Sequence, residues 1–131
     1  MMKLKNTDRA PAAVGPYSQA VEVDGFLYTS GQIGLDPATE EMVQSTDGES
    51  DFEAQAKQVL ANLEAVLANS GCTFSDVVKA TIYVMDMGNF ATLNTLYGEA
   101  MGDHRPARST VQAAGLPKGA LVEIDLVARL G

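Results

Sequence analysis

The sequence holds one cysteine, one histidine and only nine basic residues among its 131 positions. A single cysteine, Cys72, cannot form an internal disulfide, so a reducing cytoplasm is the expected compartment, with an organelle left open. The lone histidine, His104, has no second soft ligand at a useful spacing, so the sequence predicts no metal site. No apolar run approaches the length of a membrane helix, and no apolar segment follows residues 1–5 as it does in a secretory signal.

The scarcity of basic residues also bears on partners. Seventeen acidic residues outweigh the nine basic ones, which leaves a formal net charge of -8. Nucleic-acid-binding proteins usually display a basic surface, so this balance disfavours a phosphate-backbone partner and equally disfavours docking on anionic lipid. The hydrophobic content of 46% and the chain length are typical of one globular domain over residues 1–131, with no repeat or interdomain linker.

The first half of the chain predicts a hairpin and a helix. Two extended runs, Val21–Val23 and Phe26–Thr29, flank the turn signal Asp24-Gly25. Residues 36–48 are predicted to form a loop. Ser50 and Glu53 then have capping-box spacing, with Ser50 as N-cap and Glu53 reaching back. Gly71 is the expected left-handed end of the helix. Between these ends an apolar stripe recurs at helical intervals: Phe52, Ala56, Val59, Leu60, Leu63 and Leu67.

The second half predicts a strand over 77–85, a helix that Asn89 caps and Gly102 ends, and strands over 109–113 and 121–128. The apolar stripe of this helix is Phe90, Leu93, Leu96, Tyr97 and Ala100 or Met101. The element order is therefore β-β-α-β-α-β-β, an α+β fold whose two amphipathic helices cover one face of the sheet. The other face needs a cover, and self-association is the simplest one. Its expected apolar contributors are Val77, Tyr83, Met85, Val111 and Val127.

Two charged residues near the end of the chain are candidates for chemistry. Arg108 follows Pro106-Ala107 at the start of a predicted strand, and its planar guanidinium can grip a carboxylate with two parallel hydrogen bonds. Glu123 lies between two apolar residues of the last strand, where a carboxylate is costly unless it has a partner or a task. It could orient or deprotonate a water. From spacing alone, a surface ion pair is the favoured interpretation of Arg108, whereas for Glu123 a solvated strand face and a role in chemistry remain equally open.

Three further candidates lie in the first third of the chain. Ser30 has no histidine partner that could activate it, so its predicted role is hydrogen bonding rather than nucleophilic attack. Gly31 allows close approach of the backbone to a ligand, although a simple strand-end turn would use it equally well. Tyr17 follows the rigid Gly15-Pro16 turn. Its side chain is expected either to form a pocket wall or hydroxyl donor, or to be a core tyrosine whose hydroxyl has a hydrogen-bond partner.

These segments occur in a specific combination: GPYSQA, then Thr29-Ser30-Gly31-Gln32, then Pro-Ala-Arg-Ser at 106–109, then Glu123 within a strand. The combination resembles the Rid (reactive intermediate deaminase) family, also called the YjgF or L-PSP endoribonuclease family, from Ala10 to about Ala128. The resemblance implies a chorismate-mutase-like α+β fold. It also implies a homotrimer with three active sites in the clefts between subunits.

The resemblance further implies hydrolysis of enamines and imines, such as 2-iminobutanoate and 2-iminopropanoate, to 2-keto acids and ammonia without a cofactor. By position, Arg108 would bind the substrate carboxylate with help from the backbone at Thr110 and Gly31, and Glu123 would hold the attacking water. Tyr17 and Ser30 would shape the pocket and hydrogen-bond the ligand. Phe90 and Asn94 match the pattern of the second helix and would line the pocket. Thr110 stands where many Rid proteins carry cysteine, so no thiol chemistry is carried over.

Two other functions belong to different classes. Members of the family have been labelled endoribonucleases and translation inhibitors, although the net charge of -8 and the absence of a histidine pair weigh against RNA cleavage here. A trimer that binds small carboxylates without turnover would use the same cleft.

Overall fold

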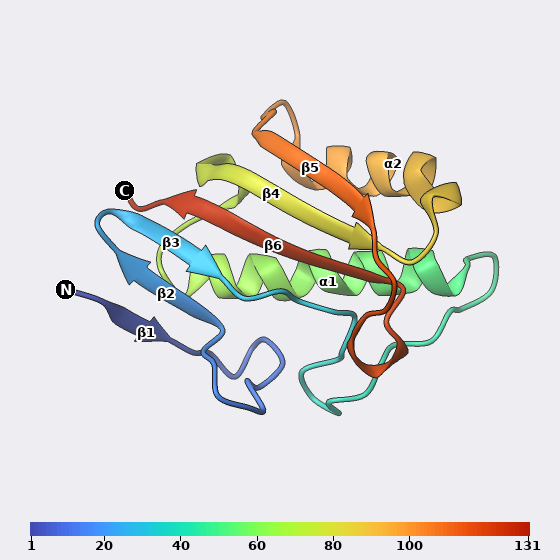
Figure 1. Ribbon diagram of the computed structural model, residues 1–131, viewed down its shortest axis with the longest axis horizontal. Coiled ribbons are helices and arrows are strands. Elements are labelled where there is room, and N and C mark those ends of the chain that lie inside the picture. Colours follow the sequence, from blue (N-terminus) through green and yellow to red (C-terminus); the bar gives the residue numbers. More distant parts are fainter.

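The structure is a computed structural model that describes all of residues 1–131. Its helices are α1 (Asp51–Ala68) and α2 (Phe90–Met101), and its strands are β1 (Lys3–Lys5), β2 (Ala20–Val23), β3 (Phe26–Thr29), β4 (Val77–Val84), β5 (Ala107–Gln112) and β6 (Val122–Arg129). The strands form one sheet in the order β1-β2-β3-β6-β4-β5, and both helices lie on the same face of it (Figure 1). The predicted α+β class, with two helices on one face, is confirmed.

Strand β6 is the last strand of the chain but lies in the middle of the sheet, between β3 and β4. Only β4 and β5 pair in parallel, and α2 provides the crossover between them. The N-terminal strand β1 is absent from the predicted order. It has only three residues, mostly exposed, which is too short for a recognisable strand pattern, so only its pairing with β2 identifies it as a strand.

Helix α1 begins and ends where the sequence predicts. The Ser50 hydroxyl accepts a hydrogen bond of 3.1 Å from the Glu53 backbone N–H. The Glu53 side chain does not return to Ser50 as a capping box requires, because its carboxylate lies 3.5 Å from the Lys57 ammonium. At the other end, Gly71 has φ of 73°, and the Cys72 N–H donates to the Leu67 carbonyl, which together form a Schellman-type cap.

Helix α2 ends as predicted but begins differently. Gly102 has φ of 63° and ends the helix. The Asn89 side chain makes no capping hydrogen bond, so the predicted cap is wrong. A 3₁₀ turn over Met87–Asn89 leads directly into α2, and Asp86 caps that turn instead by accepting from the Gly88 N–H at 2.7 Å. Asn89 therefore already has near-helical backbone, whereas an N-cap is extended.

The core lies between the helices and the sheet, and β6 contributes its predicted inner face, from Val122 through Ile124 and Leu126 to Ala128. The prediction for Val77 is wrong, because it is only 2% exposed and belongs to this core. A register shift between Val77 and Lys79 changes the alternation of β4 at that point. Tyr83, Val111 and Val127 remain on the opposite, uncovered face. Neither helix is long and apolar enough to cross a membrane.

Candidate functional site

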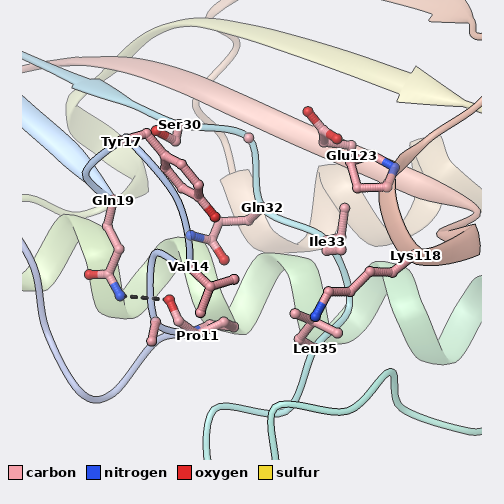
Figure 2. A pocket seen from close by; sticks show the side chains of 13 residues that line it. Pro11, Val14, Tyr17, Gln19, Ser30, Gln32, Ile33, Leu35, Lys118 and Glu123 are labelled. Carbon is pink, nitrogen blue, oxygen red and sulfur yellow. Dashed lines mark hydrogen bonds between the residues drawn. The ribbon is translucent and has the colours of Figure 1, made fainter.

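A cavity of about 510 Å³ opens beside the end of β3, and it brings together four of the predicted site residues. Figure 2 shows Tyr17 and Gln19 on one side of this cavity and Glu123, Ile33 and Lys118 on the other. The volume is in the range of small-molecule sites. The lining residues are Pro11, Ala12, Val14, Tyr17, Gln19, Ser30, Gly31, Gln32, Ile33, Leu35, Pro117, Lys118 and Glu123.

Glu123 is a partly buried carboxylate on the uncovered face of the sheet. It lies opposite Tyr83 of β4, while its neighbours Val122 and Ile124 face the core. Its carboxylate takes part in no ion pair or hydrogen bond within the chain. Burial, with a smaller contribution from the negative charge of Asp125, raises the pKa of Glu123 above its usual value. A carboxylate of this kind can accept a proton more readily than an exposed one.

Gly31 makes room for this carboxylate. A methyl group at position 31 would lie 2.7 Å from the carboxyl carbon of Glu123 and closer still to one of its oxygens. The backbone at Gly31 lies outside the left-handed region, so the requirement for glycine is one of space rather than of conformation. The group that approaches Gly31 is thus a side chain of the same protein, and the close approach of a ligand to the Gly31 backbone stays a prediction.

If Glu123 acts in the imine hydrolysis that the resemblance implies, Gly31→Ala is expected to lower kcat/KM by about 100-fold, because a misplaced catalytic group costs about that much. The melting temperature should change little, since alanine suits this backbone. Gly115→Ala is the matched control, because nothing lies within 4 Å of its added methyl group. Steady-state kinetics and thermal melting of both variants test this prediction. Native kcat/KM in Gly31→Ala would show that the position of the Glu123 carboxylate does not matter.

Asp125 is expected to affect how the reaction rate depends on pH. It shares the uncovered face with Glu123, and burial raises its own pKa as well. If Glu123 must be ionised to act, the rate falls as pH drops through its raised pKa. In Asp125→Asn the repulsion between the two carboxylates is removed, so the pKa of Glu123 falls and the acid limb of the pH–rate profile moves to lower pH. Profiles of kcat/KM for both proteins test this, and an unmoved limb would contradict it.

Tyr17 and Ser30 line the same cavity and are held by backbone contacts. The Tyr17 N–H donates to the Gly15 carbonyl at 2.8 Å, which fixes the turn, and the side chain remains half exposed. The Ser30 hydroxyl donates to the Ser18 carbonyl at 2.6 Å. Ser30 therefore offers a ligand an acceptor oxygen while its own proton is engaged.

Arg108 lies elsewhere, on the helix face of the sheet. It pairs with the fully buried Ala80 of β4, and its guanidinium carbon lies 5.5 Å from the Phe90 ring centre and 5.0 Å from that of Tyr97. These two rings of α2 stack against the cation and hold it. Arg108 also lines a second cavity, of about 360 Å³, together with Asn94. Phe90 and Asn94 thus lie beside Arg108, and their role in lining a substrate pocket stays a prediction.

Thr110 lies two residues beyond Arg108 on the same face of β5, opposite Ile82. Its hydroxyl is sealed from water and has no hydrogen-bond partner, and the same is true of the Tyr97 hydroxyl. Burial raises the pKa of Tyr97, against the lowering effect of Arg108 and Arg105. Tyr97 has no role in the sequence prediction beyond helix packing. Tyr97 lies seven residues after Phe90 and three after Asn94, on one helix face, and this spacing is the signal that identifies it.

Arg108 and Glu123 therefore do not meet within one chain. They lie on opposite faces of the sheet, on strands separated by β4, and they line different cavities. A site that uses both residues must take them from two copies of the chain.

Metal chemistry has no candidate ligand set in this structure. No group of three or more histidine, cysteine, aspartate or glutamate side chains is placed to hold an ion. The single histidine, His104, lies with its Nε2 atom 2.7 Å from the Val77 carbonyl, so its ring serves the local structure. Cys72 is buried, and burial raises the pKa of its thiol, which disfavours the reactive thiolate.

Comparison with known proteins places this geometry in context. The family model described as Endoribonuclease L-PSP matches residues 7–130. A RutC family protein of Synechocystis is 52% identical over 130 residues, which cover 98% of this chain and 97% of that protein. The 2-iminobutanoate/2-iminopropanoate deaminase of Bos taurus is 45% identical over 129 residues, which cover 98% of this chain and 90% of that protein.

Solved structures agree with the sequence relatives. A protein of the conserved Rid family from Yersinia pestis superposes with a TM-score of 0.92 and 44% identity, covering 99% of this chain and all of the other. The crystal structure of Escherichia coli TdcF with bound serine has a TM-score of 0.88 and 35% identity, covering 98% of this chain and 99% of the other.

Proposed function

This chain belongs to the Endoribonuclease L-PSP family, which includes the Rid proteins, and we propose on that premise that it hydrolyses 2-imino acids to 2-keto acids and ammonia. The name of the bovine relative supports 2-iminobutanoate and 2-iminopropanoate as the substrates. The serine bound to TdcF supports a small ligand that carries a carboxylate. The single observation that carries the proposal is the Glu123 carboxylate. It is unpaired, its pKa is raised, and it faces a cavity of small-molecule size.

The reaction needs a carboxylate anchor and a base. Arg108, held between the Phe90 and Tyr97 rings, would bind the substrate carboxylate with two parallel hydrogen bonds. Glu123 would accept a proton from a water molecule as the water oxygen bonds to the imine carbon. Glu123 then returns this proton to the nitrogen, the carbon–nitrogen bond breaks as ammonia leaves, and the added oxygen gives its remaining proton to the departing ammonia and becomes the keto oxygen. Positioning and one base suffice because a protonated imine is already electrophilic.

The same proposal includes the assembly. Arg108 of one copy would meet Glu123 of a neighbouring copy, because the two residues lie on opposite faces of one sheet. The uncovered face, with Tyr83, Val111 and Val127, would be the contact surface, in the homotrimer that the family resemblance implies. Mass measurement by light scattering after size-exclusion chromatography tests the trimer, and a monomer in solution would contradict it.

Hydrolysis of 2-iminobutanoate is the direct test of activity. A threonine dehydratase generates the imine in place, and the formation of 2-ketobutyrate is followed with and without this protein. Acceleration in proportion to the protein concentration supports the proposal. A folded oligomer that gives no acceleration contradicts it, and calorimetric binding of 2-ketobutyrate would then favour a binding protein without turnover.

The family description favours a second candidate function, cleavage of RNA. The net charge of -8 and the lone histidine argue against it. Incubation of highly purified protein with single-stranded RNA distinguishes the two activities. Cleavage that copurifies with the oligomer and persists in a variant lacking deaminase activity would establish a nuclease.

A further inference from the structure

One polar side chain in the large cavity has no task in the proposed mechanism. Gln32 is only 6% exposed, and its backbone forms a bridge to Ile124 with hydrogen bonds of 2.9 Å and 3.1 Å. This bridge ties it firmly to β6, one residue from Glu123. Its side-chain amide nevertheless makes no hydrogen bond within the chain. The contrast with the buried Gln19 is clear, because the Gln19 amide bonds to Thr7, Ala10 and Pro11.

The Gln32 amide is open to the cavity rather than sealed in the core. The buried side-chain polar atoms that lack any partner belong to Ser70, Tyr97 and Thr110, and those of Gln32 are not among them. Figure 2 shows the Gln32 amide near Val14 and Tyr17, in the part of the cavity away from Glu123. A buried amide with both a donor and an acceptor free is costly unless something in the cavity pairs with it.

The shape of the cavity indicates where this partner would come from. The reacting centre lies at Glu123, whose carboxylate occupies the space above Gly31. From there the cavity extends past Gln32 to an apolar wall that includes Val14, Ile33 and Leu35. A four-carbon imino acid is far smaller than the ligands that cavities of about 510 Å³ usually hold. The region around Gln32 is therefore free to take the side chain of a longer substrate.

We propose that Gln32 is a specificity residue, and that the protein accepts 2-imino acids whose side chain ends in a carboxamide. A carboxamide has one donor and one acceptor group, and it can pair with both free groups of the Gln32 amide at once. An apolar side chain of the same shape would leave the Gln32 groups unpaired, and a site built to hydrogen-bond its substrate rejects such an analogue. This inference rests on the proposed deaminase function.

The test compares three imines, each generated in place by an amino-acid oxidase. Glutamine supplies the carboxamide substrate, and homoleucine supplies its isosteric apolar analogue. The third, from 2-aminobutyrate, is 2-iminobutanoate, which reports the basic activity alone. Wild type and Gln32→Leu are compared, because leucine nearly preserves the side-chain volume and adds no polar group to the apolar wall. Thermal melting and the 2-iminobutanoate rate report whether the variant is intact, and Gln32→Met serves as a second variant if it is not.

Wild type should favour the glutamine imine over the homoleucine imine by at least about tenfold in kcat/KM, which corresponds to about 1.4 kcal/mol. In Gln32→Leu this preference should vanish or reverse. The rate of 2-iminobutanoate hydrolysis should stay within about twofold of wild type, because a twofold change is smaller than the effect of losing one hydrogen bond. The same preference in both proteins, or no hydrolysis of the glutamine imine by wild type, overturns the role of Gln32 and leaves the deaminase function standing. Failure with all three imines overturns both.

Discussion

Arg108→Ala is expected to lower kcat/KM for 2-iminobutanoate by about 100-fold to 1,000-fold. Truncating one partner of a hydrogen-bonded charge pair costs roughly 3–4 kcal/mol, and this variant leaves the substrate carboxylate without its cation. The fold should persist, because Arg108 is held by the faces of Phe90 and Tyr97 and by no ion pair within the chain. Coupled kinetics with threonine dehydratase measure the loss, and light scattering measures the oligomer.

The chain offers two controls for Arg108. Arg9→Ala removes the same charge from an exposed loop position and should leave kcat/KM unchanged. Arg108→Lys keeps the charge but loses the planar pair of donors, so it should recover only a small part of the activity. Near-native kcat/KM in Arg108→Ala, with the oligomer intact, would falsify the assignment of the carboxylate site to this residue.

Glu123→Gln is expected to lower kcat by about 100-fold to 10,000-fold, the range in which a general base contributes. The amide preserves the shape above Gly31 but cannot accept a proton from water. Stability should not fall, since the raised pKa of Glu123 shows that its surroundings disfavour the charged form, and the substitution removes that charge. Single-turnover kinetics, together with calorimetric binding of 2-ketobutyrate, separate the chemical step from binding.

Asp125→Asn is the matched control for Glu123, because Asp125 lies two residues along the same face of β6 and also has a pKa raised by burial. It should retain the plateau rate and change only the position of the acid limb. Equal losses in the two variants would mean that a general negative charge on this face, rather than the Glu123 carboxylate itself, supports the reaction.

Much of the fold follows from the sequence because periodicity and caps are local. The alternation of β6 follows from the order of its side chains and needs no knowledge of neighbouring strands. The two ends of α1 depend on Ser50 and Gly71, each within a few residues of the backbone groups it serves. The same locality explains the errors. Asn89 has the residue type of a cap, but the preceding 3₁₀ turn already gives it near-helical backbone. Strand β1 exists only through its pairing with β2.

By itself, the sequence determined which groups are available for chemistry: one guanidinium after Pro-Ala, one carboxylate within an apolar strand, and a glycine beside a serine. Tertiary structure alone decided where they lie. The pairing of β5 with β4 turns Arg108 toward α2, while the pairing of β6 with β4 turns Glu123 toward the uncovered face. The face that a strand residue occupies depends on register with strands distant in the chain, and one bulge reverses it, as at Val77. Whether the Gln32 amide has a partner likewise depends on where the fold places every polar group around it.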